Sequence, residues 1–188
     1  ILRPYSYQVP RGAFPERTAV WKRTGEQVKV VHESPLRDNL PSARDAVIPG
    51  IRGIAWRSDA PATLLLLEAL DGGDPRQDVP KRDRVSLLPA PFTGPPVVFA
   101  ETELRYGGIT WAFPDFALLT ERSSRTARTK TWVINPANPA AAPRLLWDRN
   151  SEDRYSHPGR LVFTYSPAEY RMVPLRSADD RWVYLEGA

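Results

Sequence analysis

The sequence predicts an all-β protein built from tandem four-stranded antiparallel sheets, and three observations support this fold class. Twenty prolines are spread along the 188 residues, and because each lacks an amide donor they argue against long helices. No segment keeps a helical period of apolar residues. Two stretches, 52–56 and 107–111, have matching surroundings and place Trp56 and Trp111 55 residues apart. A repeat of this length is typical of a β-propeller blade, so we predict a partial propeller with three to four blades.

The repeat continues beyond the two tryptophans. Each is followed by an apolar run that ends in a glutamate, at residues 64–68 and 117–121. Trp21 and Trp132 are separated by 111 residues, which is about twice the same step. The recurrence therefore covers most of the chain and predicts one kind of structural unit.

Turn residues divide the chain into strands and blades. A partial blade at about residues 1–35 contains a hairpin, residues 18–21 and 27–31, whose tight turn includes Gly25. A complete blade is expected at residues 51–100. Its run Leu64 to Leu67 is continuous rather than alternating, as in a strand buried on both faces between neighbouring blades.

The second half repeats this order. A complete blade is expected at residues 107–148, and a partial one at residues 152–188 with strand-like runs at 161–165, 170–173 and 181–185. Since a propeller closes with roughly four to eight blades, we interpret the chain as a fragment of a propeller domain in a longer polypeptide. Polar loops at 36–49 and 71–84 have the length that more often carries function than structure.

The composition indicates which classes of binding partner to expect. The net charge is +4, and 22 of the 26 basic residues are arginines interleaved with 22 acidic residues. This distribution indicates a solvated surface rather than a nucleic-acid stripe. No apolar stretch approaches the roughly 20 residues of a membrane span. The charge distribution and the apolar lengths together therefore predict neither nucleic acid nor membrane as a partner. Cysteine is absent, which leaves the cellular compartment open.

Residues for catalysis or metal binding form no recognisable constellation. There is no Gly-x-Ser-x-Gly elbow, and His32 and His157 lack a nucleophile nearby, so we predict surface or loop histidines and no catalytic residue. The loop carboxylates Asp71, Asp74, Asp78 and Asp83 are oxygen ligands of the kind calcium requires. Four basic residues share this segment, Arg76, Lys81, Arg82 and Arg84. We therefore predict a salt-bridged loop, with no metal or cofactor.

The densest basic cluster contains Arg122, Arg125, Arg128 and Lys130. On a hairpin these guanidinium groups would gather toward a carboxylate or phosphate, where bidentate geometry is most effective. The alternative is a solvated hairpin, and the absence of interleaved aromatics disfavours nucleic acid. The six tryptophans lie in strand-like contexts and are expected to pack between blades. Their positions are Trp21, Trp56, Trp111, Trp132, Trp147 and Trp182.

Five motifs in order resemble the non-catalytic propeller region of the glutamyl endopeptidase branch of the prolyl oligopeptidase family. They lie at residues 3–7, 54–57, 68–75, 104–111 and 148–155. The resemblance runs from residue 1 to about residue 159, weakens over 160–170, and returns at 183–188. The chain also departs from the family where Ser123 and Ser124 replace expected bulky aromatics.

Members of this family are serine peptidases in which an N-terminal propeller covers a C-terminal α/β-hydrolase domain. The resemblance implies a parent protein that cleaves peptides after glutamate with a Ser-Asp-His triad. None of the matched motifs carries a triad residue, so the catalytic domain is expected downstream of Ala188. The chain would then meet peptide substrate through that domain, which it would cover and gate. Its expected substrate contacts are the carboxylate-binding candidates Arg3, Arg122, Arg125 and Arg128.

A different class of function also fits the sequence. A propeller-like binding or scaffold module with no linked hydrolase would show the same repeats. With three to four blades, either protein would leave sheet edges exposed, and we expect these edges to allow self-association.

Overall fold

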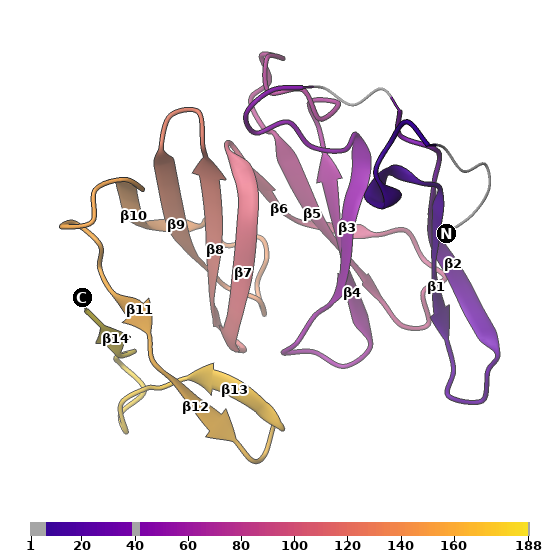
Figure 1. The fold of residues 1–188 in the computed structure, drawn as a ribbon. Coiled ribbons are helices and arrows are strands. Elements are labelled where there is room, and N and C mark those ends of the chain that lie inside the picture. The colour runs from indigo at the N-terminus through magenta and orange to yellow at the C-terminus, as the bar shows by residue number, and fades with distance from the viewer. Residues whose placement is uncertain (1–6, 39–41, 188) are drawn as a thin grey trace.

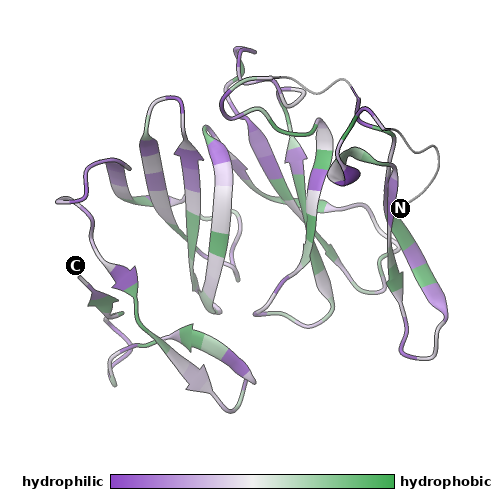
Figure 2. Cartoon of the chain, in the orientation of Figure 1, coloured by the Kyte–Doolittle hydropathy of each residue, from purple (hydrophilic) through white to green (hydrophobic). Residues whose placement is uncertain are grey.

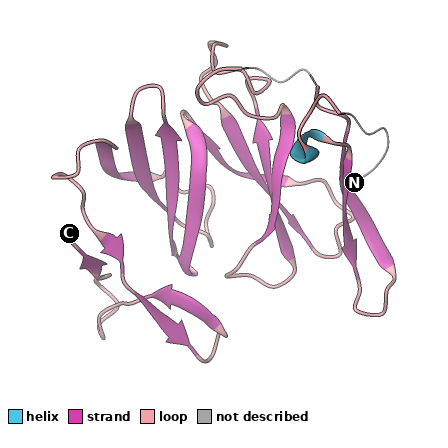
Figure 3. Ribbon diagram, in the orientation of Figure 1, coloured by secondary structure: helices cyan, strands magenta, loops and turns pink. Residues whose placement is uncertain are grey.

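The computed structural model describes residues 7–38 and 42–187, which are organised almost entirely into β-strands and turns (Figure 1). The helical structure in this described part is a single 3-10 turn, η1 (Arg11–Ala13). Strands and loops make up the rest of the ribbon in Figure 3. The predicted all-β class is therefore confirmed.

Two complete four-stranded antiparallel sheets form the centre of the molecule. In each, consecutive strands are hydrogen-bonded neighbours, so each sheet is a simple meander. The first contains β3 (Gly50–Trp56), β4 (Thr63–Ala69), β5 (Asp83–Pro89) and β6 (Val97–Thr102). The second contains β7 (Arg105–Phe113), β8 (Phe116–Ser123), β9 (Arg128–Ile134) and β10 (Arg144–Asn150). The two sheets lie side by side (Figure 1).

The 55-residue repeat is reproduced in the strand register. Each sheet begins with a strand that carries a register shift just before a glycine, Gly53 in β3 and Gly108 in β7. Trp56 lies opposite Leu64, and Trp111 lies opposite Ala117. The two tryptophans therefore occupy equivalent positions near the ends of equivalent strands.

Smaller strand pairs flank the complete sheets. On one side β1 (Glu16–Trp21) and β2 (Gln27–Ser34) form the predicted hairpin, with Gly25 at a φ of 87° in its turn. On the other side the chain ends in two short pairs, β12 with β13 and β11 with β14. Their bounds are β11 (Arg160–Leu161), β12 (Phe163–Ser166), β13 (Arg171–Pro174) and β14 (Leu185–Glu186). Pro174 at the end of β13 has no backbone N–H to donate to a neighbouring strand, which helps to keep this pair short.

The leucine run of β4 connects three layers of the molecule. Leu65 and Leu67 pack into a cluster that includes Trp111 and Leu119 of the second sheet. Leu64 and Leu66 face the opposite way, into a cluster that Val20 and Val31 of the β1–β2 hairpin join. The prediction of a strand buried on both faces is confirmed. Each fully buried leucine stabilises the packing by about 1.5–3 kcal/mol, and apolar residues, green in Figure 2, recur along both sheets.

The packing role expected for the tryptophans holds for Trp111 and for the partly buried Trp132, which pack in the apolar cluster shared by the two sheets, and it fails for three others. Trp111 is only 8% exposed, whereas Trp21, Trp56 and Trp182 are more than half exposed. Trp111 contacts Phe99 of the neighbouring sheet at a centroid distance of 5.4 Å. Trp56, at the equivalent place, meets the edge of Phe92 at 6.0 Å. The difference arises because burial depends on which element lies against the strand end, and the strand pattern does not encode this.

Candidate functional site

Asp83 lies at the seam between the two complete sheets, at the first position of β5. Its side chain is fully buried. Its carboxylate accepts hydrogen bonds from Arg52 Nη2 at 2.6 Å and Arg105 Nη1 at 3.1 Å. It also accepts one from the backbone N–H of Tyr106 at 2.7 Å. Since Arg52 belongs to the first sheet and Arg105 to the second, one carboxylate joins the two.

Asp71 provides a second buried carboxylate beside the first, from the loop that connects β4 and β5. It accepts hydrogen bonds from Arg82 Nη1 at 2.9 Å, Arg105 Nη2 at 2.6 Å and the backbone N–H of Gly73 at 3.0 Å. The loop can turn so tightly because Gly72 and Gly73 take φ values of 63° and 79°, which glycine adopts at little cost.

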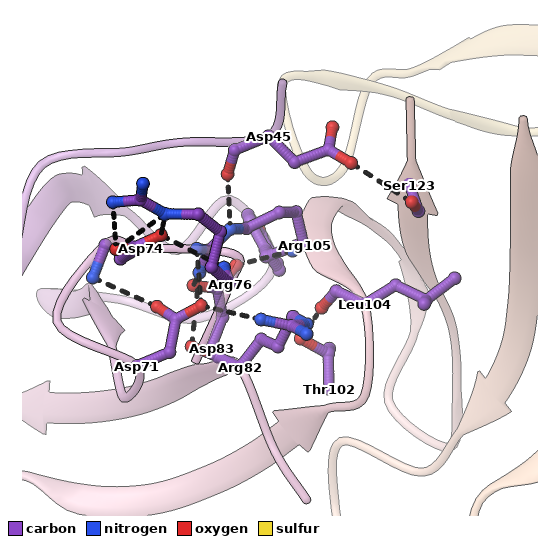
Figure 4. Close-up of polar contacts among 12 residues, drawn as sticks. Asp45, Asp71, Asp74, Arg76, Arg82, Asp83, Thr102, Leu104, Arg105 and Ser123 are labelled. Carbon is purple, nitrogen blue, oxygen red and sulfur yellow. Dashed lines mark hydrogen bonds and ion pairs between the residues drawn. The ribbon is translucent and has the colours of Figure 1, made fainter. Parts of the chain in front are cut away.

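Arg105 is the centre of this network, shown in Figure 4. Its side chain is 5% exposed. Besides the two carboxylates, its Nε donates to the carbonyl oxygen of Asp45 at 2.8 Å and its Nη1 to that of Arg82 at 3.4 Å. The sequence analysis gave Arg105 no role, because nothing in its local pattern distinguishes it from a solvent-facing strand arginine.

Asp45 extends the network to the turn between β8 and β9. Its carboxylate accepts hydrogen bonds from Ser123 Oγ at 3.0 Å and from the backbone N–H groups of Ser124 and Arg125 at 2.9 and 3.1 Å. Burial raises the pKa of Asp45, but these hydrogen bonds together outweigh burial and lower it below the ordinary value. The residue takes a φ of 65°, so the loop is held in an unusual conformation against the second sheet.

The prediction of a salt-bridged acidic loop is confirmed. Asp71 pairs with Arg82, and Asp74 pairs with Arg76 through Nη2 at 2.7 Å. Hydrogen bonds from Arg76 lower the pKa of Asp74 to about 2. The strongest cationic partner, Arg105, comes from outside the loop. In the part of the chain that the structure describes, no three His, Cys, Asp or Glu side chains gather as metal ligands would.

A polar cavity of about 310 Å³ opens beside this network. It is bordered by the loop that bears Asp45, by the β4–β5 loop, and by the turn that follows β8. Arg122 and Arg125 both line it and both are exposed. Within the described residues, neither guanidinium group has a hydrogen-bond or ion-pair partner. The basic cluster of the sequence thus contributes two free cations to one cavity.

The other two predicted contacts are placed differently. Arg128 lies outside the lining of this cavity and donates from Nε to Asp148 Oδ1 of β10 at 2.7 Å, with a second hydrogen bond from Nη2. These hydrogen bonds lower the pKa of Asp148. Arg3 lies outside the described residues.

A second cavity, of about 200 Å³, lies further along the same seam. Phe99, Leu119 and Trp132 contribute to its wall. At its edge Lys130 Nζ lies 2.7 Å from Glu103 Oε2, and its hydrogen bond lowers the pKa of that carboxyl. Trp132 Nε1 donates to the buried Glu121 at 2.9 Å. This arrangement satisfies buried polar groups.

The histidines lie apart from any catalytic arrangement. His157 is exposed, and its Nδ1 accepts a hydrogen bond from the backbone N–H of Gly159 at 3.0 Å. His32 lies on β2 beside a small cavity. Across the described residues, no serine hydroxyl is hydrogen-bonded to either histidine. The same part of the chain contains no helix with the length and apolar character needed to cross a membrane.

The fold and its seam define a tandem-sheet β region stabilised by buried charge, with no catalytic group assembled in the described residues. Two proteins similar to the chain are named as endopeptidases. The chain is 40% identical over 186 residues, 97% of its length, to a protein named "Probable glutamyl endopeptidase, chloroplastic" from Arabidopsis thaliana. It is 42% identical over its full length to a protein of the same name from Oryza sativa subsp. japonica.

This similarity confirms the resemblance to glutamyl endopeptidases that the five motifs indicated. The chain spans 19% and 20% of the length of these two relatives. It is therefore homologous to about a fifth of proteins that are much longer. No family model matches the chain, and no solved structure matches it.

Proposed function

We propose that this chain is the non-catalytic propeller part of a serine peptidase that cleaves peptides after glutamate. In this role it covers and gates the active site of a downstream α/β-hydrolase domain. The observation that carries the proposal is the 40–42% identity to a fifth of proteins named glutamyl endopeptidase. The chemistry would belong to the remainder of the parent protein.

The sheet architecture supports a propeller. Two meanders of four strands follow one another, and their facing sides share one apolar cluster. The β1–β2 hairpin packs on the outer side of the first meander. Arg171 of β13 donates to the carbonyl oxygens of Trp111 and Ala112 at 3.0 and 2.9 Å, which attaches the last strands to the second meander. Such lateral stacking of four-stranded sheets is how a propeller is built.

The covering role is supported by contacts that close both ends of the seam between the meanders. At one end the buried carboxylates of Asp71 and Asp83 share Arg105. At the other end Arg57 lies 4.5 Å from the ring centroid of Trp111, a cation–π contact between the sheets. A cover must exclude folded proteins while peptides enter, and a seam closed at both ends suits that task.

Two preparations test the proposal: the 188-residue chain and the longer polypeptide that carries it. We expect the longer protein to hydrolyse a glutamyl p-nitroanilide much faster than its glutaminyl counterpart, and to react with a fluorophosphonate probe. The 188-residue chain should do neither, because it contains no nucleophile elbow. Labelling of a serine within the chain would overturn the assignment, and a longer protein inert toward both reagents would favour a binding or scaffold module.

The covering role has its own test in the longer protein. Asp83→Asn weakens the buried seam, whereas Asp74→Asn removes an exposed ion pair from the same region. We expect Asp83→Asn alone to raise the rate of casein cleavage relative to the small anilide. An unchanged ratio would contradict a cover that depends on this seam. Self-association through exposed sheet edges stays a prediction, to be checked by light scattering of the 188-residue chain.

A further inference from the structure

We propose that Arg122 and Arg125 form a receptor for the carboxylate of an acidic peptide side chain, at the cavity of about 310 Å³ beside the seam. This inference rests on the proposed function and specifies where the covering part would contact its substrate. It selects two of the four arginines that the sequence suggested.

The charge of the cavity is concentrated in these two residues. Arg82 and Arg105 also line it, but both are paired with Asp71 through hydrogen bonds of 2.9 and 2.6 Å. Arg105 donates four hydrogen bonds within the protein, and its side chain is only 5% exposed. Among the described residues, Arg122 and Arg125 have no partner for their guanidinium donors, and a planar guanidinium matches a carboxylate in bidentate geometry.

The turn that carries Arg125, directly after Arg122 and Ser123 at the end of β8, is held in place before any ligand arrives. Asp45 accepts hydrogen bonds from Ser123 Oγ and from the backbone N–H groups of Ser124 and Arg125. Asp45 is in turn fixed through its carbonyl oxygen by Arg105. Since the backbone of the turn is already ordered, binding does not bear the cost of ordering it.

The rest of the wall favours a peptide over other anions. Pro75, Val79, Pro80 and Leu104 give it an apolar side that suits a peptide backbone and its aliphatic neighbours. No aromatic side chain is among the described residues that line it, so bases would find no stacking surface. Glu103, which also lines the cavity, is paired with Lys130 and Lys81, so its negative charge is already offset. One carboxylate between two guanidinium groups is the ligand that this combination fits.

The test measures binding without hydrolysis, on the 188-residue chain. The probes are two end-blocked pentapeptides with an uncharged fluorophore, one with a central glutamate and one with glutamine. We expect fluorescence anisotropy at low salt to show about tenfold tighter binding of the glutamate peptide, the effect of one charge-assisted bidentate contact. The double variant Arg122→Gln/Arg125→Gln should lose this preference. Arg17→Gln, which breaks an exposed ion pair with Glu33, should keep it.

A second variant separates geometry from charge. Arg122→Lys/Arg125→Lys retains both charges without the guanidinium fork, and we expect a preference between those of the wild type and the glutamine variant. Equal binding of both peptides by the wild type would overturn the proposal. So would a glutamate preference that survives in the glutamine variant. All four proteins should show the same far-UV circular dichroism, because both side chains are exposed.

The proposed function and this inference fail in distinguishable ways. If the chain shows an arginine-dependent preference for glutamate but the longer parent protein cleaves no glutamyl anilide, the carboxylate receptor is supported and the peptidase function is refuted. Cleavage by a parent protein whose KM for acidic peptides is unaffected by Arg122→Gln/Arg125→Gln would refute the receptor alone.

Discussion

Replacing Arg105 by methionine should be among the most destabilising single changes available at the seam. The substitution keeps an unbranched apolar side chain but removes the guanidinium group that contacts Asp71 and Asp83, whose side chains are fully buried. Each carboxylate would retain one arginine, Arg82 or Arg52. Removing one partner from a buried ion pair costs about 3–5 kcal/mol, and here both carboxylates and two backbone carbonyl oxygens lose a hydrogen-bond donor. Against a typical total of about 5–15 kcal/mol, this is a large fraction.

Urea unfolding followed by tryptophan fluorescence measures this loss. With a slope of about 2 kcal/mol per M urea, a loss of about 4 kcal/mol lowers the midpoint by about 2 M. The matched control is Arg84→Met, which removes an exposed strand arginine paired with Glu101 and should cost less than about 1 kcal/mol. If both variants lose equal stability, or if Arg105→Met loses less than about 1 kcal/mol, the buried network does not hold the sheets together.

Two further predictions concern pH and the loop backbone. Lys130 lowers the pKa of Glu103 below 4.5. The folded carboxylate therefore binds protons more weakly than the unfolded one. The stability that this shift contributes is complete above about pH 4.5 and is lost as pH falls through the lowered pKa. Urea midpoints from about pH 6 to about pH 3 should fall less steeply for Glu103→Gln, and parallel curves would contradict this. Gly73→Ala places a Cβ 2.1 Å from the carbonyl oxygen of Val47 at a φ of 79°, so it should cost more than about 2 kcal/mol. Gly72→Ala, with open space at a φ of 63°, should cost only the roughly 1–2 kcal/mol of left-handed strain, and equal thermal midpoints would refute the role of the contact.

The strands could be predicted from the sequence because their signals are local. The continuous leucines of β4, the proline and glycine turns, and the recurrence of Trp56 and Trp111 all lie within short windows. The recurrence also marks equivalent strands, since Trp56 ends β3 and Trp111 lies near the end of β7. Exposure could not be predicted in this way, because Trp111 is covered by Phe99 and Arg57 from another sheet.

The central residue of the site was missed for a related reason. The acidic loop was recognised as salt-bridged, and Arg82 within it does pair with Asp71. Arg105 contacts Asp71 and Asp83 across 34 and 22 residues of sequence, a separation at which composition and spacing carry no signal. The segment itself holds four basic residues for its four aspartates, so nothing in it indicates that a further arginine is needed. Which arginines of the basic cluster are paired also depends on the three-dimensional structure. Arg128 pairs with Asp148, whereas Arg122 and Arg125 have no partner among the described residues.

The burial of Arg105 gives the molecule an uneven response to ionic strength. Salt screens exposed charges over about 8–10 Å in ordinary buffers, but it screens desolvated pairs far less. Concentrated salt would therefore weaken surface pairs such as Arg17–Glu33 on the β1–β2 hairpin and leave the bond between the two complete sheets nearly intact. As electrolyte rises, the periphery should loosen first, while the central pair of sheets moves as one rigid body.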